Sequence, residues 1–554
     1  MSILELSDRL VDDIASLSPI AATLMGIPGY DHLWQDFSPE GVQRAADMLR
    51  TYEAAALRLD DSGDDWERLA RRVLLDFVGR SLSEIESGDH LRDVNNSASP
   101  LQMVVQVFDM MDAQSAEGCS NIVRRLSSME QVLGSYRDAL EEGVVRNLLA
   151  ARRQVASAVE ECRSHAGHGS FLENLASRVT ACEEADVASL STAVEAARKA
   201  FGSLADYLEQ EYLPVAPIED AVGEARYVRA ARHFLGADID TLDTYAWGWS
   251  EVRTLWDRME RVAGEIAPGR SVADVLRLLK TDPDRCVPDE GAFLDFIRNR
   301  QVDAVERLSG SHFEIPDKMR HVDVKLAPAG SALGAYYMQP SEDFSRPGAV
   351  FYALPDRRPI SIYDEVSTAY HEGYPGHHLQ IGIQVGLADN LSRLHRMVVW
   401  YPGYGEGWAL YVEELMDELG FYDRPDYVMG LLVNQMHRAC RVVIDIGCHV
   451  GYAIPDDAGF HPGEVWSYDL AVELLEQRAF LDPSYARSEV TRYLGWPGQA
   501  ISYKVGERVI REIRAGLEQR YGDSFDVKKF HSDLLGCGPL GLDHLREVML
   551  GESR

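Results

Sequence analysis

The sequence predicts a mainly α protein that contains a small β element of short strands. In long stretches before residue 310, apolar residues recur at positions i, i+3, i+4 and i+7, as on one face of an amphipathic helix. Such stretches cover residues 10–27, 42–59, 66–82 and 190–213. Residues 321–355 instead form short apolar runs interrupted by proline and glycine, which indicates strands: HVDVKLAPAG, LGAYYMQPS and RPGAVFYALP.

Helical periodicity returns in the second half of the chain, which also holds most of the reactive side chains. Asp364 suits the N-cap of a helix over residues 364–387. From these changes along the chain we expect an N-terminal helical lobe over residues 1–320. We expect a catalytic helical lobe with a metal site over residues 321–554.

The composition is that of a globular protein with a strongly acidic surface. The 554 residues are 46% hydrophobic, and 55 Lys and Arg against 89 Asp and Glu give a net charge of −34. A field of that sign repels phosphate backbones and anionic lipid surfaces, so binding of nucleic acid or of a membrane surface is not expected. No stretch reaches the roughly 18 apolar residues that a spanning helix needs. The first residues are too acidic for a signal peptide.

The seven cysteines are widely spaced and include no CxxC pair, so we expect neither a disulfide framework nor a cysteine zinc site. This use of cysteine favours a reducing compartment, and with no targeting segment it predicts a cytoplasmic protein. The oligomeric state stays open, with a homodimer as one option.

The segment HEGYPGHHLQ, residues 371–380, gathers three histidines and a glutamate. Zinc hydrolases commonly use two histidines on one helix face, with a glutamate beside the first as general base, in the form HExxH. His371 and Glu372 match the start of that pattern, but the i+4 position is Pro375. We interpret the segment as a metal site rather than as a set of surface histidines.

The second histidine ligand has two candidates. Pro375 and the glycine after it disfavour a regular helix, and a two-residue bulge there would bring His377 to the place of an i+4 ligand. His378, at i+7, lies on the same face but about 10.5 Å further along an unbroken helix. That is too far for two imidazoles on one zinc ion, so we favour His377.

A three-ligand catalytic zinc site needs one more donor. We choose Glu406 in YPGYGEGWALYVEEL, because the 35 residues after His371 leave room for a loop and a second antiparallel helix. The glycines on either side of Glu406 allow close backbone approach. Glu413 and Glu414 are rival ligands, two turns further on, that fit a supporting role or a solvated face better.

A polar stripe follows in NQMHRACRVVIDIGCH, where Arg438, Arg441, Asp445 and His449 are spaced by three, four and four residues. One interpretation is a buried Arg–Asp network that braces the helices. The other is an arginine that binds a substrate carboxylate, or an acid that orients a ligand histidine.

Two tyrosines and a lysine lie around the Pro-Gly turn of RYLGWPGQAISYKVG: Tyr493, Tyr503 and Lys504. A tyrosine hydroxyl can donate to the oxyanion that forms when water attacks an amide. The alternative is ordinary helix packing by the same side chains.

Four of these motifs together resemble a bacterial domain-of-unknown-function family, number 885, whose members are regarded as zinc metallopeptidases. They are HEGYPGHHLQ, EGWALYVEEL, RACRVVIDIGCH and PGQAISYKVG. Two further segments also fit this family: SPIAATLMGI near the N-terminus and AYYMQP before the histidine motif. The resemblance therefore covers nearly the whole chain.

The chain is more distantly similar to the carboxypeptidase Taq family, an all-helical clamshell of zinc carboxypeptidases. This likeness implies His371, His377 and Glu406 as ligands, Glu372 as the base and Tyr503 as the tail tyrosine. The chain departs from that family by two extra residues between the histidines. Dipeptidyl peptidase III, with HExxGH, resembles a one-residue version of the same lengthening.

We therefore expect a zinc-dependent metallopeptidase, carboxypeptidase-like or dipeptidase-like, that hydrolyses short peptides. Zn²⁺ would be held by His371, His377 and Glu406, with Glu372 as general base. Tyr503, with Tyr493 as a second candidate, would stabilise the oxyanion, and Arg438 or Arg441 would bind a C-terminal carboxylate. Two alternatives stay open: a non-catalytic metal-binding or scaffold protein, and a metal-dependent hydrolase of a non-peptide amide.

Overall fold

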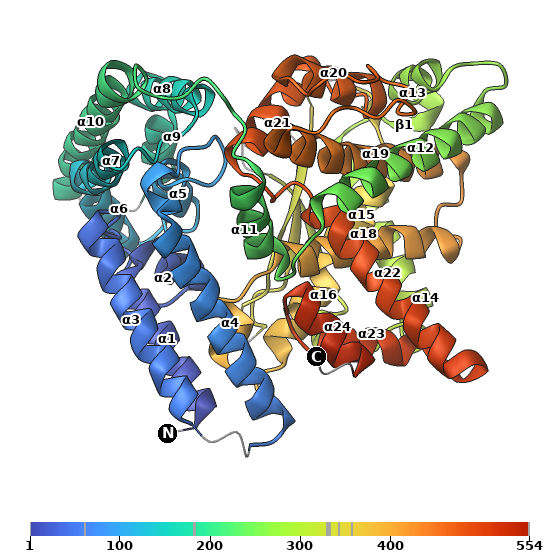
Figure 1. The fold of residues 1–554 in the computed structure, drawn as a ribbon, viewed down its shortest axis with the longest axis horizontal. Helices are drawn as coiled ribbons and strands as arrows, with labels where there is room; N and C mark the ends of the chain where they lie inside the picture. Colours follow the sequence, from blue (N-terminus) through green and yellow to red (C-terminus); the bar gives the residue numbers. More distant parts are fainter. Residues whose placement is uncertain are drawn as a thin grey trace. The chain divides into compact units, whose positions relative to one another are not determined.

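The computed structural model describes residues 2–59, 63–180, 184–327, 334–341, 344–355 and 358–551. It confirms a mainly α fold with a few short strands (Figure 1). The chain forms two compact units. The first comprises residues 1–220, 390–399 and 494–496, and the second comprises residues 221–389, 400–493 and 497–554.

This division falls about 100 residues before the boundary that we expected at residue 320. The helices between residues 224 and 308 pack with the second unit, although their periodicity resembles that of the preceding helices. Periodicity shows that a helix has an apolar face, but it does not show which partner covers that face.

The first unit is built from helices alone in its described residues. They are α1 (Ile3–Leu17), α2 (Pro19–Met25), α3 (Pro39–Arg58), α4 (Asp65–Ser87), α5 (Pro100–Gln106), α6 (Ala116–Ser127), α7 (Met129–Val145), α8 (Arg152–Ala166), α9 (Phe171–Arg178), α10 (Glu184–Tyr207) and α17 (Arg393–Met397). Short 3-10 or π turns extend some of them at Asp89–Arg92, Val107–Asp109 and Leu208–Tyr212.

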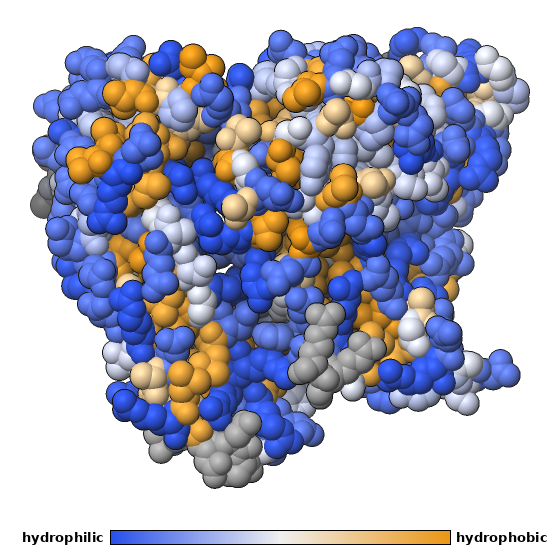
Figure 2. Space-filling view, viewed as in Figure 1, coloured by the Kyte–Doolittle hydropathy of each residue, from blue (hydrophilic) through white to orange (hydrophobic). Residues whose placement is uncertain are grey.

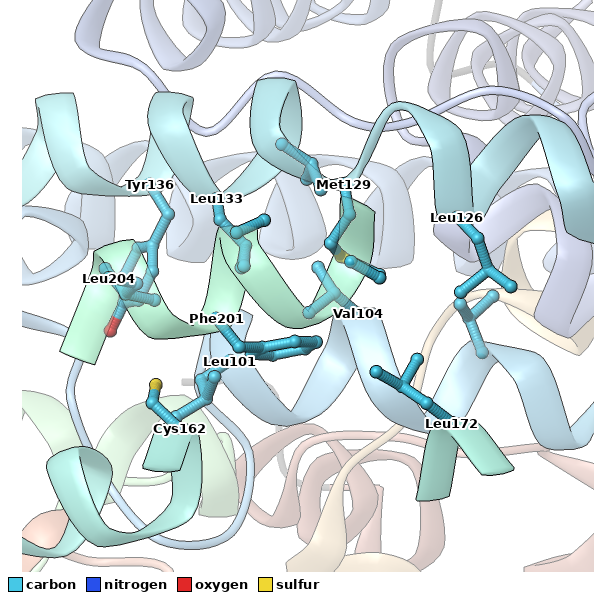
Figure 3. Packing of buried hydrophobic residues seen from close by; sticks show 14 of the residues in the cluster. Leu101, Val104, Leu126, Met129, Leu133, Tyr136, Cys162, Leu172, Phe201 and Leu204 are labelled. Carbon is cyan, nitrogen blue, oxygen red and sulfur yellow. The ribbon is translucent and has the colours of Figure 1, made fainter. Parts of the chain in front are cut away.

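The core of the first unit surrounds α10. Phe201 and Leu204 on this helix are buried against side chains of α5 to α9, which Figure 3 shows from close by. The partners labelled there are Leu101, Val104, Leu126, Met129, Leu133, Tyr136, Cys162 and Leu172. Burial of this apolar surface provides the main driving force for folding of the unit.

Arg125 is a charged side chain that lies inside this unit. Arg125 on α6 has no exposed surface and donates to the carbonyl oxygens of Leu33 at 3.0 Å and Pro19 at 3.2 Å, and to the hydroxyl of Thr23 at 3.0 Å. Its guanidinium lies 5.1 Å from the ring centroid of Trp34. Burial lowers the pKa of Arg125 to about 10, so the side chain stays charged at neutral pH. It therefore holds the segment after α2, which has no regular structure of its own.

The second unit contains the remaining helices. They are α11 (Glu224–Leu235), α12 (Thr241–Ile266), α13 (Val272–Thr281), α14 (Glu290–Leu308), α15 (Glu365–Glu372), α16 (His377–Gly386), α18 (Pro402–Glu418), α19 (Pro425–Ile446), α20 (Tyr468–Arg478), α21 (Pro483–Gly495), α22 (Ser502–Tyr521), α23 (Val527–Gly536) and α24 (Leu542–Leu550). Short 3-10 or π turns lie at Pro283–Arg285, Asp317–Met319, Gly447–Gly451 and Gly522–Ser524.

Two small sheets accompany these helices, as the short apolar runs predicted. In one sheet β4 (Ala349–Ala353) lies between β2 (Asp323–Leu326) and β3 (Gly334–Met338). β2 pairs with β4 in parallel, and β3 pairs with it antiparallel. The other sheet joins β1 (Cys286–Val287) to β5 (Ile360–Ser361). β3 and β4 also lie near α15, so the sheet supports the helix that begins the histidine motif.

The cysteines differ from the expectation. Cys119 is disulfide-bonded, whereas five other cysteines are free: Cys162, Cys286, Cys440, Cys448 and Cys537. Wide sequence spacing could not exclude a bridge, because bridging depends on the distance between Cα atoms in the fold. The bond removes one of the grounds on which a reducing compartment was expected.

Hydrophilic residues cover most of the face drawn in Figure 2, in keeping with the acidic composition. Among the described helices, none combines the length and hydropathy of a bilayer-spanning segment.

Replacement of Arg125 tests its role in the first unit. Arg125→Leu leaves several buried oxygen acceptors without a donor, so it should lower the free energy of unfolding by about 3 kcal/mol. Arg125→Lys should recover little of this loss, because an ammonium cannot reach the same set of acceptors as a guanidinium. Urea unfolding measures both variants. The exposed Arg58→Ala serves as control and should stay within about 0.5 kcal/mol of wild type, and an equally small change for Arg125→Leu would contradict the assignment.

Candidate metal centre

The predicted helix over residues 364–387 is divided in two. It begins where expected, with Asp364 just before α15, although the Asp364 side chain makes no capping hydrogen bond. α15 ends at Glu372 and α16 begins at His377. The two extra residues between the histidines are thus absorbed by a break of the helix and not by a bulge within it.

Glycines at both ends of the break allow close contacts with neighbouring groups. A Cβ atom at position Gly376 would lie 1.9 Å from the carbonyl oxygen of His371. A Cβ atom at Gly373 would lie 2.1 Å from the side-chain oxygen of Gln301. At Gly376 the clash is with backbone, so the chain can turn back on itself there only with glycine, whereas at Gly373 a Cβ atom would displace the Gln301 side chain.

Two side chains from other helices hold the break. Gln301 on α14 donates to the carbonyl oxygen of Ala369 at 2.8 Å and accepts from the backbone N–H of Tyr374 at 2.7 Å. Trp408 on α18 donates through Nε1 to the carbonyl oxygen of Pro375 at 3.0 Å. These bonds satisfy backbone groups that lost their helical partners, and so fix where His377 restarts the helix.

The structure brings His371, His377 and Glu406 together, as the sequence predicted. Each offers one ligand atom, and these atoms lie within 4.8 Å of one another. Oε2 of Glu406 lies 3.3 Å from Nε2 of His371 and 3.5 Å from Nε2 of His377. The two rings are nearly perpendicular, with centroids 4.9 Å apart. Both imidazoles therefore direct one nitrogen to the same carboxylate.

The rival carboxylates have other partners. Glu413, which is 1% exposed, accepts from Nδ1 of His371 at 2.7 Å and from the hydroxyl of Ser367 at 2.7 Å. This bond fixes the ring of His371 so that Nε2 faces Glu406, as is common for metal-binding histidines. Glu414 pairs with Arg258 at 2.9 Å and does not join the cluster.

His378, the rival second histidine, points elsewhere. Its Nδ1 lies 3.0 Å from the hydroxyl of Tyr337, and its Nε2 lies 2.9 Å from the carbonyl oxygen of Met319. Burial lowers the pKa of His378 to about 4, so this ring is neutral. It braces α16 against β3, and His377 is the histidine that joins the cluster.

The charges of the cluster depend on one another. Burial disfavours the charged form of His371, but its bonds to Glu406 and Glu413 outweigh this effect and raise its pKa to about 10. Burial likewise acts to raise the pKa of Glu406, but the hydrogen bonds and charges of the two histidines hold it well below its usual range. The cluster thus holds positive charge next to the Glu406 carboxylate.

The donor set fits a zinc ion. Oε2 of Glu406 is buried, and Nε2 of His371 and Nε2 of His377 face it at 3.3 and 3.5 Å without a well-aligned hydrogen bond. Two imidazoles and one carboxylate are a common ligand set of catalytic zinc, with a further position left for water or substrate. An acceptor oxygen in such a position is what a cation would stabilise.

Glu372, the predicted base, is the last residue of α15 and lies beside the cluster. Burial raises the pKa of Glu372, while the charges of His371 and His377 oppose the rise. A carboxylate with a raised pKa is a stronger proton acceptor than an ordinary glutamate and can return the proton later.

Tyr503 also lies in the field of the cluster. Burial raises the pKa of its hydroxyl, and the negative charge of Glu406 adds to the rise. The guanidinium of Arg441 lies 4.7 Å from the Tyr503 ring centroid, and that of Arg438 lies 5.8 Å from it. Glycines allow the backbones of α18 and α22 to come into contact beside Tyr503. A Cβ atom at Gly506 would lie 1.9 Å from the carbonyl oxygen of Gly403.

Tyr493 belongs to a separate buried network. Its hydroxyl donates to Oε2 of Glu489 at 2.7 Å and accepts from Nε of Arg441 at 3.1 Å. Arg441 also donates to Glu489 at 2.9 Å. The hydroxyl proton of Tyr493 is thus committed to Glu489, and Tyr503 is the tyrosine beside the cluster.

The residues of the predicted polar stripe bind different partners, and Asp445 does not pair with Arg441. Asp445 accepts from the hydroxyl of Tyr227 at 2.8 Å and from the backbone N–H of Gly498 at 3.0 Å. His449 lies 3.1 Å from the carbonyl oxygen of Tyr493. Burial raises the pKa of Asp445 to about 7. This carboxyl anchors the turn that leads into α22.

Sequence reasoning missed the residues that support the cluster. Gln301, Trp408 and Glu489 lie on other helices, and no local pattern connects them to the histidine motif. Ser367 could have been noticed, because it precedes His371 by four residues and therefore shares its helix face. Lys504, which sequence reasoning grouped with the tyrosines, pairs with Glu507 at 2.6 Å and with Glu251 at 3.0 Å.

Fold and site define a mainly helical protein with a buried His–His–Glu cluster at a broken helix. The chain belongs to the DUF885 family, described as bacterial protein of unknown function, whose model matches residues 19–549. No curated protein matches the sequence.

Two solved structures share the fold. One is a candidate lipoprotein from Colwellia psychrerythraea, with 22% identity, a TM-score of 0.85 and coverage of 99% of this chain and 98% of that chain. The other is a candidate lipoprotein of unknown function from Shewanella oneidensis, with 17% identity, a TM-score of 0.75 and coverage of 99% and 100%.

The buried Asp445 predicts a pH dependence of stability. Because its folded pKa of about 7 lies above the ordinary aspartate value of 3.8, its protonated form stabilises the fold at low pH, and that contribution is lost as pH rises from about 4 to 7. Between pH 4 and pH 8, the unfolding free energy of Asp445→Asn should therefore gain roughly 2–4 kcal/mol relative to wild type. Urea unfolding at several pH values measures the difference. The exposed control Asp456→Asn should show no such trend, and a flat profile for Asp445→Asn would contradict the assignment.

Proposed function

We propose that this chain is a zinc-dependent metallopeptidase that hydrolyses short peptides. The observation that supports it best is the convergence of His371, His377 and Glu406 next to the carboxylate of Glu372. A zinc site with a purely structural role needs no such base. The combination of ligands with an adjacent proton acceptor is typical of metal-assisted hydrolysis.

The roles of the residues follow from their positions. His371, His377 and Glu406 would hold the zinc ion, with Glu413 keeping His371 in the required orientation. When bound, zinc supplies Lewis-acid polarisation of the amide carbonyl and makes water more acidic. Glu372 accepts the proton of the attacking water and delivers it to the leaving amine.

Tyr503 is proposed to donate its hydroxyl proton to the oxyanion of the tetrahedral intermediate. The raised pKa of this hydroxyl keeps it protonated at neutral pH, so it can act as a donor. Arg438 and Arg441 border its ring and would keep the phenol in place.

The environment of Arg441 supports a proposed exopeptidase specificity, either carboxypeptidase-like or dipeptidase-like. It is 6% exposed, and its Nε and Nη2 are used by Tyr493 and Glu489. Its Nη1 is buried and has no hydrogen-bond partner among the described residues. The same holds for Nε of Arg438. Buried guanidinium donors without an acceptor are suited to a carboxylate that arrives with the substrate.

Glu372→Gln tests the proposal. The amide keeps the shape of the side chain but cannot accept a proton, so peptide hydrolysis should fall by about 10²–10⁴-fold. Zinc content, measured by atomic emission after dialysis, should stay at the wild-type level, because Glu372 is not a ligand. Initial rates on a mixture of short peptides, followed by mass spectrometry, give the activity. A zinc-loaded wild type that cleaves no peptide would refute the function, and an equally active Glu372→Gln would remove Glu372 from the mechanism.

Tyr503→Phe tests the oxyanion donor. If the hydroxyl acts mainly in the transition state, kcat should fall by about 10²-fold while KM changes little. The melting temperature separates this result from a packing role, since loss of a packing contact would lower stability and leave turnover intact. Tyr493→Phe provides the matched comparison and should affect stability more than kcat, because its hydroxyl is bonded to Glu489.

A further inference from the structure

Trp400 is a large side chain beside the His–His–Glu cluster that has no role in the proposed chemistry. It is 39% exposed, whereas Val399 and Tyr401 on either side are each 2% exposed. A Cβ atom at Gly236 would lie 2.7 Å from Cε1 of Tyr401, so the ring of Tyr401 packs against the end of α11. The neighbouring side chains thus anchor the chain in the interior, while Trp400 presents its ring to solvent.

The start of α18 holds the indole in place. A Cβ atom at Gly405 would lie 2.3 Å from Cη2 of Trp400 and 2.7 Å from its Cζ2. The absence of a side chain at Gly405 therefore leaves room for the indole to lie against the backbone of the helix. Gly405 directly precedes Glu406, so the indole packs one residue away from a member of the cluster.

A second contact places the indole beside a histidine of the cluster. The ring centroids of Trp400 and His377 lie 6.4 Å apart, with the ring planes inclined by 55°. Trp400, α16 and α18 all belong to the second unit. Single exposed apolar side chains are common on protein surfaces, but this one is fixed by two contacts next to a cluster of reactive groups.

Solvent reaches the cluster at Glu406. The side chain of Glu406 is 18% exposed, whereas those of the other cluster residues, His371 and His377, are 7% and 9% exposed. Because Trp400 lies against the residue next to Glu406, its exposed ring borders the open part of the cluster. A substrate that arrives from solvent would meet the indole there.

We propose that Trp400 forms a subsite for an aromatic or large aliphatic side chain of the peptide substrate, at one of the two residues joined by the scissile bond. This inference rests on the proposed peptidase function. An extended peptide advances about 3.3–3.6 Å per residue, so the 6.4 Å between the two rings is less than the length of two residues. A carbonyl held at the cluster thus brings a neighbouring side chain within reach of the indole.

The chemistry of the indole decides which side chains are favoured. Tryptophan supplies a large, rigid apolar surface, and aromatic pairs are favourable at centroid distances of about 4.5–7 Å. An indole face also attracts cations, but a zinc ion in the cluster would repel a lysine or arginine side chain. The chain would therefore select phenylalanine, tyrosine or leucine over alanine and lysine at this position.

The test uses tetra-alanine and the four peptides in which one alanine is replaced by phenylalanine, on the zinc-loaded full-length chain. Mass spectrometry gives the cleaved bond and the initial rates. For the wild type, kcat/KM should be at least about 10-fold higher when phenylalanine borders the cleaved bond than for tetra-alanine. In Trp400→Ala this preference should fall to about 2-fold or less.

Trp66→Ala on α4 is the matched control, since Trp66 is 36% exposed and lies in the first unit. It should keep the wild-type preference for phenylalanine. The corresponding four lysine peptides should show no preference over tetra-alanine in the wild type. Zinc content and melting temperature verify that all variants are equally loaded and folded.

Binding provides a measurement that does not need turnover. On zinc-loaded Glu372→Gln, calorimetry should give a Kd at least about 5-fold lower for one or more of the phenylalanine peptides than for tetra-alanine. Adding Trp400→Ala to this variant should remove most of that difference.

Other results would overturn the subsite. Equal kcat/KM of the wild type for tetra-alanine and the phenylalanine peptides would do so while leaving the peptidase function intact, as would a phenylalanine preference that persists in Trp400→Ala. A preference for the lysine peptides would contradict its apolar character. Should Trp400→Ala fail to fold, Trp400→Gln must lower the preference by at least about 3-fold, and an unchanged preference counts against the subsite. If the wild type cleaves no peptide, the proposed function fails, and the calorimetric comparison alone decides the subsite.

Discussion

The arrangement of the site depends on one local constraint, the break between Glu372 and His377. The motif has two residues too many for both histidines to face one metal on a regular helix. The break removes this conflict, because the chain turns tightly on Gly373 and Gly376 and restarts with His377 at the first turn of α16. Backbone groups exposed by the break would be costly in the interior, and bonds from Gln301 and Trp408 satisfy them. Packing of α14 and α18 against this point is therefore a condition for the His–His–Glu cluster.

Buried charge is the second constraint on this unit. His371 lies between two carboxylates, and Arg441 is bonded to Glu489. Removing ionised groups from water costs several kcal/mol each, and paired charges in a protein interior often recover little more than that cost. A hydrophobic packing of the same volume would serve stability as well. These buried charges therefore add little to the free energy of unfolding beyond what apolar side chains of the same volume would give.

Similarity to known structures supports the fold, whereas the proposed function is argued from the side chains of this chain. Two solved bacterial structures share the fold at 22% and 17% identity, and the family description states no activity. Because one fold can support many activities, similarity at this level does not carry a substrate or a reaction. The proposal of a peptidase rests instead on donor atoms, their hydrogen bonds and their burial.

The sequence by itself determined the mainly helical class, the short strands and two residues of the cluster, His371 and Glu406, and it favoured His377 over His378 as the third. It could do so because amphipathic periodicity and a dense set of His and Glu residues are local properties. The choice between His377 and His378, and the role of Glu413, were decided only by the tertiary structure. The sequence also missed Gln301, Trp408 and the disulfide of Cys119, and the division into compact units near residue 220 lies about 100 residues before the lobe boundary expected from the sequence. These features arise from contacts between helices far apart in the chain, and a helical pattern specifies that a face is buried but not which partner buries it.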